Sequence, residues 1–296
     1  MNNIRSAWGR WGPKDQRGAV NLLAPSLAAK AIGLVKVGKV YSLGAPVGRL
    51  GPIGTRNATH HYVTIHQDSS VGGAGSADDV LVTHCHASTH LDALSHHWYD
   101  GLLYNGHPAT GITPRGAGVC GVENVGGILT RGLMLDIPAV LGLQRLPENY
   151  AITPRDLDAA LEAENVAPQA GDVVLVRTGW YSAYLENPQI TSKNCPGLDT
   201  ASIRWISRYD LVAIGADNAA VEIWPPQQRT PDEIEWHRKG ILPLHAFVLR
   251  DLGVYLMEFI NLEDLASDRV FEFLFVAMPL RIIGGVGSPI NPLAVV

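Results

Sequence analysis

The chain has 296 residues, of which 46% are hydrophobic and 17% charged, and its formal net charge at pH 7 is −5. A chain of this length can bury a substantial core without disulfides, and its apolar content excludes an intrinsically disordered protein. The acidic balance and the absence of any run of basic residues make nucleic acid an unexpected partner. The three cysteines, Cys85, Cys120 and Cys195, are odd in number and far apart, so no disulfide framework is expected.

Short β-rich runs recur along the chain, and several are apolar almost throughout, which is typical of strands covered on both faces. Helical signals lie between them, including an N-cap and first-turn pair at Thr153 and Pro154 and a helix-ending glycine at Gly253. This mixture favours an α/β or α+β domain. The predicted strands cover residues 38–44, 61–67, 80–86, 132–138, 172–180, 211–217, 254–260 and 270–282, and the predicted helices cover 25–35, 153–166, 200–209 (capped by Asp199) and 241–253.

One domain spanning residues 1–296 is expected, because α/β and mostly-β domains often exceed 200 residues. Residues 1–16 lack the apolar core and the cleavage pattern of a signal peptide. No apolar run approaches the roughly 20 residues that a bilayer requires. We therefore expect a cytoplasmic protein without membrane contact.

The unusual feature of the composition is a cluster of histidines. The chain has 11 histidines, and six of them fall within residues 84–107. Scattered surface residues would not gather in this way, so this segment is expected to need imidazoles for its chemistry. The six are His84, His86, His90, His96, His97 and His107.

His86, His90 and Asp92 form a three-ligand set, which leaves one position of a metal ion free for water, as catalytic sites require. On a straight strand His86 and His90 would lie about 13 Å apart, too far to share one ion. A turn or a helix must therefore join them, and the composition favours a strand that runs into a loop. His90 and Asp92 are two residues apart, so both side chains lie on one face of a strand. A lone histidine is more often a core or surface residue, but this combined pattern is specific.

The segment from His86 to His96, HASTHLDALSH, resembles the signature HxGTHxDxPxH of the cyclase-like metal hydrolase family, which includes bacterial kynurenine formamidases and isatin hydrolase. Ser88 and Leu94 stand where the family has glycine and proline, so the loop is expected to differ in shape. The similarity extends over most of the chain. It includes residues 11–12 and 18–23, the LDIP motif at 135–138, the RTGW motif at 177–180, the GAD turn at 215–217, and the pair His245 and Glu258.

The resemblance implies roles for the site residues. His86, His90 and Asp92 would hold a first metal ion, and Asp92, His245 and Glu258 would hold a second. His96 would act as general acid/base, a task that suits a group with a pKa near 6.5. The expected cofactor is a divalent ion, zinc or manganese. The resemblance also implies a swivelling β/β/α domain, with a mixed sheet flanked by helices, that assembles as a homodimer or homotetramer.

The leading hypothesis is therefore a metal-dependent hydrolase of an amide, lactam, lactone or ester bond in a small, cyclic or aromatic substrate. Metal-bound hydroxide would be the attacking group. Trp98, Tyr99, Tyr104 and Trp180 are either core residues or walls of the substrate pocket.

Other interpretations assign these residues differently. One alternative is a non-haem iron oxygenase, since His90, Asp92 and His245 match a 2-His-1-carboxylate triad, although it leaves His86 and His96 unused. Another is a metal-binding protein without catalysis, which would have a closed site. His84 is an alternative ligand in place of His86. His97 is expected to lie next to the metal ligands without binding the ion. A nucleophilic role for Cys85 would need an activating base and an electropositive setting, and is not expected for a residue flanked by metal-binding residue types.

Overall fold

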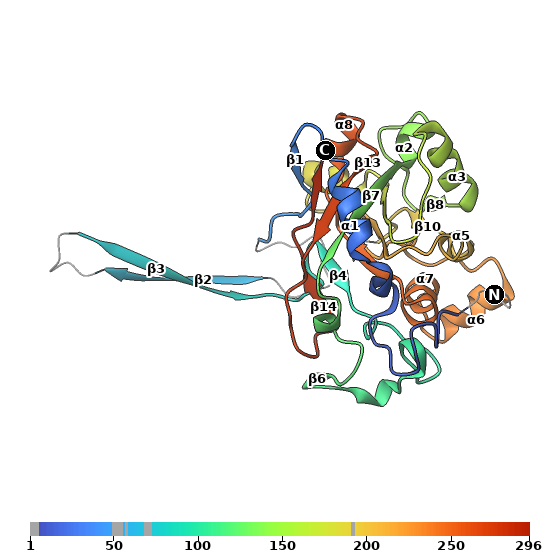
Figure 1. The fold of residues 1–296 in the computed structure, drawn as a ribbon, viewed down its shortest axis with the longest axis horizontal. Coiled ribbons are helices and arrows are strands. Elements are labelled where there is room, and N and C mark those ends of the chain that lie inside the picture. Colours follow the sequence, from blue (N-terminus) through green and yellow to red (C-terminus); the bar gives the residue numbers. More distant parts are fainter. Residues whose placement is uncertain (1–5, 49–55, 57–58, 68–72, 191–192) are drawn as a thin grey trace.

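The computed structural model describes residues 6–48, 56, 59–67, 73–190 and 193–296. Within them, a mixed nine-stranded sheet runs through the body of the molecule and helices lie along its flanks (Figure 1). The predicted α/β class, with a mixed sheet flanked by helices, is confirmed. In spatial order the strands are β1 (Val40–Ser42), β15 (Leu293–Val295), β13 (Glu272–Ala277), β7 (Ile128–Asp136), β9 (Val173–Arg177), β11 (Ala213–Ala216), β12 (Tyr255–Glu258), β4 (His90–Asp92) and β14 (Gly287–Pro289).

The centre of the sheet consists of four neighbouring parallel strands, β7, β9, β11 and β12. Every residue of β9, β11 and β12 is buried, as expected of apolar strands that are covered on both faces. Parallel neighbours need a crossover connection, and helices follow β7, β9 and β11 along the chain. The strands beyond this centre pair antiparallel, among them β4, which lies between β12 and β14.

Each of the four predicted helices is present, although the one predicted to follow Asp199 covers only Ser202–Ile206, and the helices at 137–140, 180–186, 231–238 and 263–267 were not predicted. Thr153 and Asp156 form a capping box at the start of α3, and Gly253 ends the helix around residue 250 with a φ of +64°. No helix in the described part of the chain is long and apolar enough to cross a membrane. The helices are α1 (Pro25–Ile32), α2 (Ile137–Val140), α3 (Pro154–Ala163), α4 (Trp180–Glu186), α5 (Ser202–Ile206), α6 (Pro231–Arg238), α7 (Pro243–His245), which continues as a π-helix (Ala246–Leu252), and α8 (Glu263–Ser267), with 3₁₀ turns at Gly18–Leu22, Tyr104–Gly106, Ala109–Gly111 and Val122–Asn124.

Two of the predicted strands lie outside the main sheet. β2 (His60–Gln67) and β3 (Gly75–Val82) pair with each other and, among the described residues, with no other strand; they form a long antiparallel hairpin that projects from the body (Figure 1). The strand predicted over 80–86 therefore ends at Val82, because the chain turns at residues 85–86. The strand predicted over 172–180 likewise ends at Arg177, because α4 begins at Trp180. Two further small sheets pair β8 (Ala151–Ile152) with β10 (Gly197–Leu198), and β5 (Ile112–Thr113) with β6 (Gly116–Ala117).

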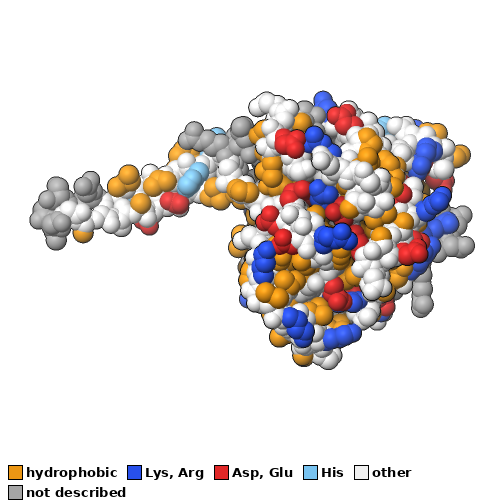
Figure 2. All heavy atoms as spheres, turned by 90° about the horizontal axis from the view of Figure 1, so that it is seen from above, with side chains coloured by type: hydrophobic (Ala, Val, Ile, Leu, Met, Phe, Trp, Pro, Cys, Tyr) orange, Lys and Arg blue, Asp and Glu red, His pale blue; other side chains and the backbone are white. Residues whose placement is uncertain are grey.

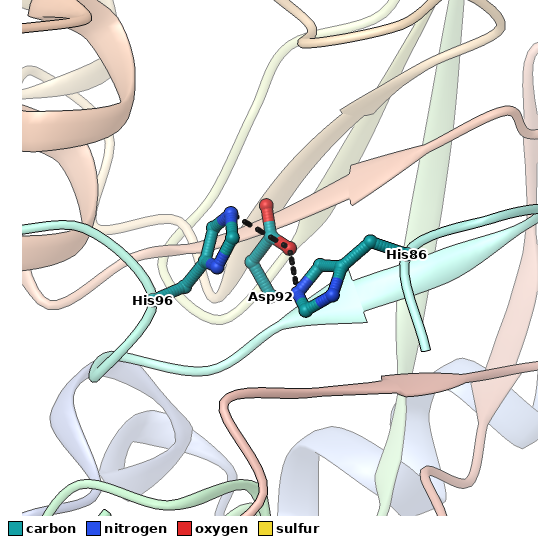
Figure 3. A group of neighbouring side chains, drawn as sticks. All are labelled: His86, Asp92 and His96. Atoms are coloured by element: carbon teal, nitrogen blue, oxygen red, sulfur yellow. Dashed lines mark ion pairs between the residues drawn. The ribbon is translucent and has the colours of Figure 1, made fainter. Parts of the chain in front are cut away.

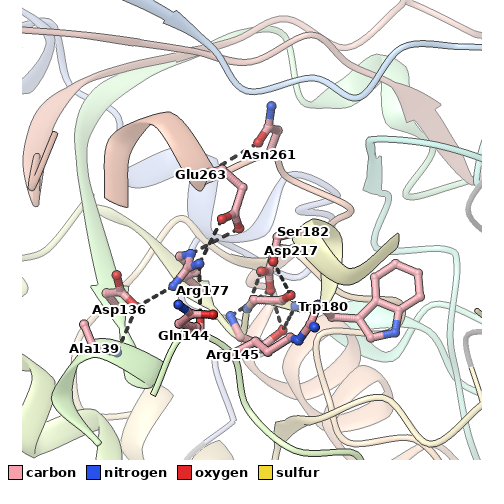
Figure 4. Close-up of polar contacts among 12 residues, drawn as sticks. Asp136, Ala139, Gln144, Arg145, Arg177, Trp180, Ser182, Asp217, Asn261 and Glu263 are labelled. Carbon is pink, nitrogen blue, oxygen red and sulfur yellow. Dashed lines mark hydrogen bonds and ion pairs between the residues drawn. The ribbon is translucent and has the colours of Figure 1, made fainter. Parts of the chain in front are cut away.

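Charged side chains join the carboxyl ends of the central strands (Figure 4). Arg177, the last residue of β9, donates to Asp136 at the end of β7 and to both carboxylate oxygens of Glu263 on α8. Asp217, just after β11, accepts from the Thr178 amide and hydroxyl and from the Gly179 amide. The motifs at 135–138, 177–180 and 215–217 therefore meet in one structural network.

The network also contains a carboxyl group with a raised pKa, which gives a prediction for stability. Glu164 accepts from the Asp136 amide through Oε1, while its buried Oε2 has no partner among the described residues. Burial, helped by the charge of Asp136, raises the pKa of Glu164 from 4.5 to about 8. Between pH 4.5 and about pH 8 the folded protein therefore holds a proton on Glu164 that the unfolded chain has lost. The stability that protonated Glu164 contributes is complete below pH 4.5 and is lost as the pH rises to about 8.

We expect Glu164→Gln to leave stability unchanged near pH 4.5 and to raise it above pH 8, because glutamine keeps the acceptor for the Asp136 amide without a buried charge. Urea unfolding of both proteins across this range measures the effect. Glu162→Gln, at an exposed position of the same helix, is the control. An equal difference between Glu164→Gln and wild type at both ends of the range would contradict the prediction.

Candidate metal centre

The edge of the central sheet positions the first group of candidate ligands. β4 pairs with β12 so that His90 lies directly opposite Glu258. Cross-strand partners and residues two apart share one face of a sheet, so His90, Asp92 and Glu258 all project to the same side. All three side chains are buried.

Two loops bring in the other histidines of the motif. His86 lies in the turn between the projecting hairpin and β4, as the predicted passage from strand to loop requires, and His96 lies in the loop that follows β4. Figure 3 shows both imidazoles turned toward the carboxylate of Asp92. Their rings stack with centroids 4.3 Å apart. Gly287 on β14 makes room for this arrangement, because a Cβ there would collide with Nε2 of His86.

A third element supplies His245, the last residue of α7. Its Nδ1 lies 2.7 Å from Oε1 of Glu222, and Glu222 also accepts from the backbone amides of Leu244 and His245. Nε2 of His245 faces the other way, 3.1 Å from Oε1 of Glu258 and 3.7 Å from Oδ2 of Asp92. Glu222 therefore fixes the direction in which His245 points.

All six predicted site residues converge on one point. Oδ1 of Asp92 lies 3.2 Å from Nε2 of His86, 3.2 Å from Nε2 of His90 and 3.8 Å from Nε2 of His96. Two nitrogen or oxygen ligands, each about 2.1 Å from one tetrahedral ion, lie about 3.4 Å apart. The distances from Asp92 Oδ1 to these nitrogens therefore match the separation of atoms that coordinate the same metal ion.

The hydrogen bonding of the rings also fits a cation. Nδ1 of His90 lies 2.8 Å from the carbonyl oxygen of Ser88, which only accepts, so Nδ1 carries the proton. In the neutral ring Nε2 then presents a lone pair toward the carboxylates of Asp92 and Glu258. Nδ1 of His245 likewise faces an acceptor, Oε1 of Glu222, so that Nε2 is the nitrogen that could give up its proton and bind a cation. Both oxygens of Asp92 and Nε2 of His86 are buried without a hydrogen-bond partner among the described residues. A bound divalent ion would satisfy these atoms together.

The pKa values reflect this crowding of charge. Burial, together with neighbouring imidazoles, lowers the pKa of His96 to about 4, so its ring is neutral at pH 7 and can accept a proton. Burial opposes a charge on His245, but its hydrogen bonds with Glu222 and Glu258 outweigh burial and raise its pKa to about 10. Burial also opposes ionisation of Asp92, but the nearby imidazoles of His96 and His90 hold its pKa well below the usual range.

The structure brings together His86, His90, Asp92, His96, His245 and Glu258, although the groups of closest ligand atoms differ from those that the resemblance implies. Atoms within 4.8 Å of one another form one group of His86, Asp92 and His96 and another of His90, Asp92 and Glu258. Asp92 belongs to both groups. His84, in contrast, is exposed, and it is His86 that approaches Asp92. His97 lies beside His245, with ring centroids 5.4 Å apart.

Glu222 is the functional candidate that the sequence analysis missed. Its only local sign in the sequence is a charged residue between two apolar ones, Val221 and Ile223. A carboxylate that holds a ligand histidine sets its tautomer and orientation, and losing it costs about 10–100-fold in metal affinity.

We therefore expect Glu222→Gln to bind zinc or manganese about 10–100-fold more weakly while keeping its fold. Titration of the metal-free protein by calorimetry measures this affinity. Glu233→Gln, at another buried glutamate that caps α6, is the control and should bind like the wild type. Equal affinities in Glu222→Gln and the wild type would show that His245 does not hold the ion.

Aromatic side chains lie on one side of the metal centre. Phe259 follows Glu258, and its ring lies 6.3 Å from His90 and 5.7 Å from Trp180. Trp180 also stacks on Tyr184. Of the other predicted pocket residues, Tyr104 is a core residue bonded to Asp15, Tyr99 donates to Asp251, and Trp98 is partly exposed.

Comparisons with known proteins identify the family of this chain. The sequence profile of the family described as Putative cyclase matches residues 23–223. The chain belongs to this family. Among its curated relatives, isatin hydrolase of Roseibium aggregatum is 25% identical over 286 residues, which are 94% of this chain and 97% of the relative.

Solved structures confirm the cyclase fold. The crystal structure of a novel cyclase is 34% identical, covers 99% of this chain and 100% of its own, and superposes with a TM-score of 0.86. An isatin hydrolase bound to the product analogue thioisatinate is 23% identical, with coverages of 92% and 96% and a TM-score of 0.59. The predictions that this chain is a cyclase-family protein and an enzyme of the hydrolase class are confirmed.

Proposed function

We propose that this cyclase-family protein hydrolyses an amide, lactam, lactone or ester bond in a small cyclic or aromatic substrate, with zinc or manganese as cofactor. The observation that supports this most strongly is the convergence of four imidazoles on the carboxylate of Asp92, with Glu258 close to two of them. Both oxygens of Asp92 and Nε2 of His86 are buried without a hydrogen-bond partner among the described residues. When bound there, a divalent ion supplies a Lewis acid and lowers the pKa of a coordinated water to about 7.

Residues of the chain would orient the ligands and transfer the proton. The rings of His90 and His245 are buried and are held by the Ser88 carbonyl and the Glu222 carboxylate, so these two rings keep their orientation without reorganisation. His96 is the more accessible ring, 22% exposed, and its neutral imidazole can accept a proton and return it to the leaving nitrogen or oxygen. Trp180 and Phe259 are buried in a small apolar cluster, so they pack beside the centre rather than expose a surface to substrate.

The name of the relative isatin hydrolase supports a cyclic amide as substrate class, since isatin is a lactam fused to an aromatic ring. The oxygenase triad of His90, Asp92 and His245 leaves His86, His96 and Glu258 without a role at the same centre. A closed structural metal site also fits less well, because His86 and His96 keep exposed surface.

The test is a hydrolysis screen of the zinc- and manganese-loaded enzyme under nitrogen with isatin-like lactams, formyl-anilides and unsaturated lactones. We expect ring opening or amide cleavage of at least one class, and its loss after chelation. Turnover that requires ferrous iron and oxygen would overturn the proposal in favour of an oxygenase.

A further inference from the structure

Arg250 is a buried charged residue that takes no part in the metal centre described above. Figure 2 shows lysines and arginines spread over the surface of the body among acidic side chains, whereas Arg250 is only 7% exposed. Of the described arginines, only Arg177 is buried to a similar extent, and it joins the ends of the central strands. A buried charge is costly unless it is paired and hydrogen-bonded. The partners of Arg250 therefore indicate which parts of the chain it holds together.

Arg250 connects the two elements that carry His245 and His96. It lies on the π-helix that continues from His245, and its Nε donates to the carbonyl oxygen of Leu102, 3.0 Å away, in the loop that follows His96. Its guanidinium carbon also lies 3.8 Å from the ring centre of Tyr99 in the same loop. The attraction between a cation and an aromatic ring is stronger where water is excluded. These contacts hold the loop of His96 against the helix of His245.

The loop depends on such contacts because it has little regular structure of its own. Residues 93–103 are all described, and apart from a single bridge between Tyr99 and Leu102 they belong to no helix or strand. The π-helix holds Tyr99 through two further contacts, since its hydroxyl donates to Asp251 and its ring centre lies 5.2 Å from that of Phe247. His96 lies three residues before Tyr99, so the position of its imidazole depends on where Tyr99 is held.

The N-terminal segment, residues 6–11, covers the contact between helix and loop. The ring centre of Trp8 lies 4.6 Å from the guanidinium carbon of Arg250, and its indole N–H donates to the Arg250 carbonyl oxygen, 2.6 Å away. The amide of Ala7 donates to the carbonyl oxygen of Asp251. Arg250 and Asp251 also form an ion pair, which is stronger where an apolar ring keeps water away. Trp8 therefore shields this pair and fixes the backbone that bears it.

We propose that Trp8 is a positioning residue of the metal centre, which keeps Arg250 against Tyr99 and thereby holds His96 beside Asp92. The effect on catalysis rests on the proposed hydrolase function, in which His96 transfers the proton. The effect on the loop rests on the contacts alone. Precise placement matters because a shift of about 1 Å in a reacting group can lower a rate by about 100-fold.

The first test is hydrogen–deuterium exchange of the metal-free full chain, measured by mass spectrometry on peptides that cover residues 96–107. We expect these peptides to exchange at least about tenfold faster in Trp8→Leu, because the loop then opens more often. Trp8→Phe keeps a ring over the guanidinium and should stay within about threefold of the wild type. Both variants leave Arg250 in place, whereas its removal would leave the buried carboxylate of Asp251 without its ion-pair partner.

The second test is steady-state kinetics on the substrate found in the screen, together with calorimetric titration of zinc or manganese. We expect Trp8→Leu to lower kcat by about 10–100-fold, with KM and metal affinity within about threefold of the wild type, because the proton-transfer group is displaced while the buried ligands stay in place. Trp8→Phe should restore most of kcat. A loss of kcat without a loss of metal separates positioning from a general weakening of the fold.

The matched control is Trp11→Leu. Trp11 is a half-buried indole of the same segment that lies over a different arginine, Arg10. Trp11→Leu should lower thermal stability as Trp8→Leu does, but it should leave kcat and the exchange of residues 96–107 unchanged. Wild-type exchange in Trp8→Leu, equal acceleration in the control, or faster exchange with a wild-type kcat would each overturn the proposal. The exchange needs neither metal nor substrate, so failure of the hydrolase proposal alone would leave its expected result unchanged.

Discussion

Asp92→Asn is expected to lose most of the bound metal and to lower kcat/KM by at least about 10³-fold. Asp92 is the one residue common to both groups of ligand atoms, and its oxygens face His86, His90 and His96 on one side and His245 on the other. Asparagine keeps the shape but offers only one neutral acceptor. The loss of a metal that acts as Lewis acid costs several kcal/mol of transition-state stabilisation, and about 4 kcal/mol corresponds to a 10³-fold lower rate.

Metal per chain by elemental analysis and kcat/KM on the substrate found in the screen are the two measurements. The control is Asp199→Asn, which removes a buried carboxylate outside the centre that accepts from Ser202 and Arg229. It should keep the wild-type metal content. Asp92→Asn with full metal content and activity within tenfold of the wild type would refute the assignment of Asp92 as the shared ligand.

His96→Gln is expected to retain the metal and to lower kcat by about 10²–10⁴-fold, the usual contribution of a general acid or base. The imidazole lies at the accessible side of the centre, and its distance of 3.8 Å from Asp92 is the longest among the three histidines that face Oδ1. Its neutral state at pH 7 allows it to take up a proton.

The same experiment separates a proton-transfer role from a ligand role, because His96 also belongs to a group of atoms with ligand spacing. Full metal content with low kcat indicates proton transfer. Loss of metal from His96→Gln would contradict the predicted role and make His96 a ligand. His84→Gln, an exposed histidine in the same segment, is the control and should change neither quantity by more than a small factor.

The local part of the metal centre could be predicted from the sequence because spacing along one segment fixes it. The strand-to-loop passage that brings His86 toward His90, and the shared face of His90 and Asp92, are confirmed. His245 and Glu258 come from distant elements, so no spacing rule connects them to the motif, and only the family resemblance placed them there. Glu222 was missed because a buried acidic residue alone does not reveal which histidine it holds.

The central sheet was predictable for a similar reason, since the predicted strands at 172–180, 211–217 and 254–260 each contain a run of apolar residues and occupy its buried middle. The hairpin was not, because residues 61–67 and 80–86 have the same β-rich composition. An apolar strand pattern predicts a strand with buried faces, but it does not indicate which other elements pack against those faces. The order of the strands depends on long-range pairing that no local pattern records.

The most direct test of the account is anomalous X-ray scattering from crystals of the purified protein, recorded on both sides of the zinc and manganese absorption edges. The account predicts a peak between Oδ1 of Asp92 and Nε2 of His90, within about 2.0–2.2 Å of each, at one of these edges. Zinc- or manganese-loaded crystals without a peak among Asp92, His90 and Glu258, or with the ion bound elsewhere on the chain, would contradict it.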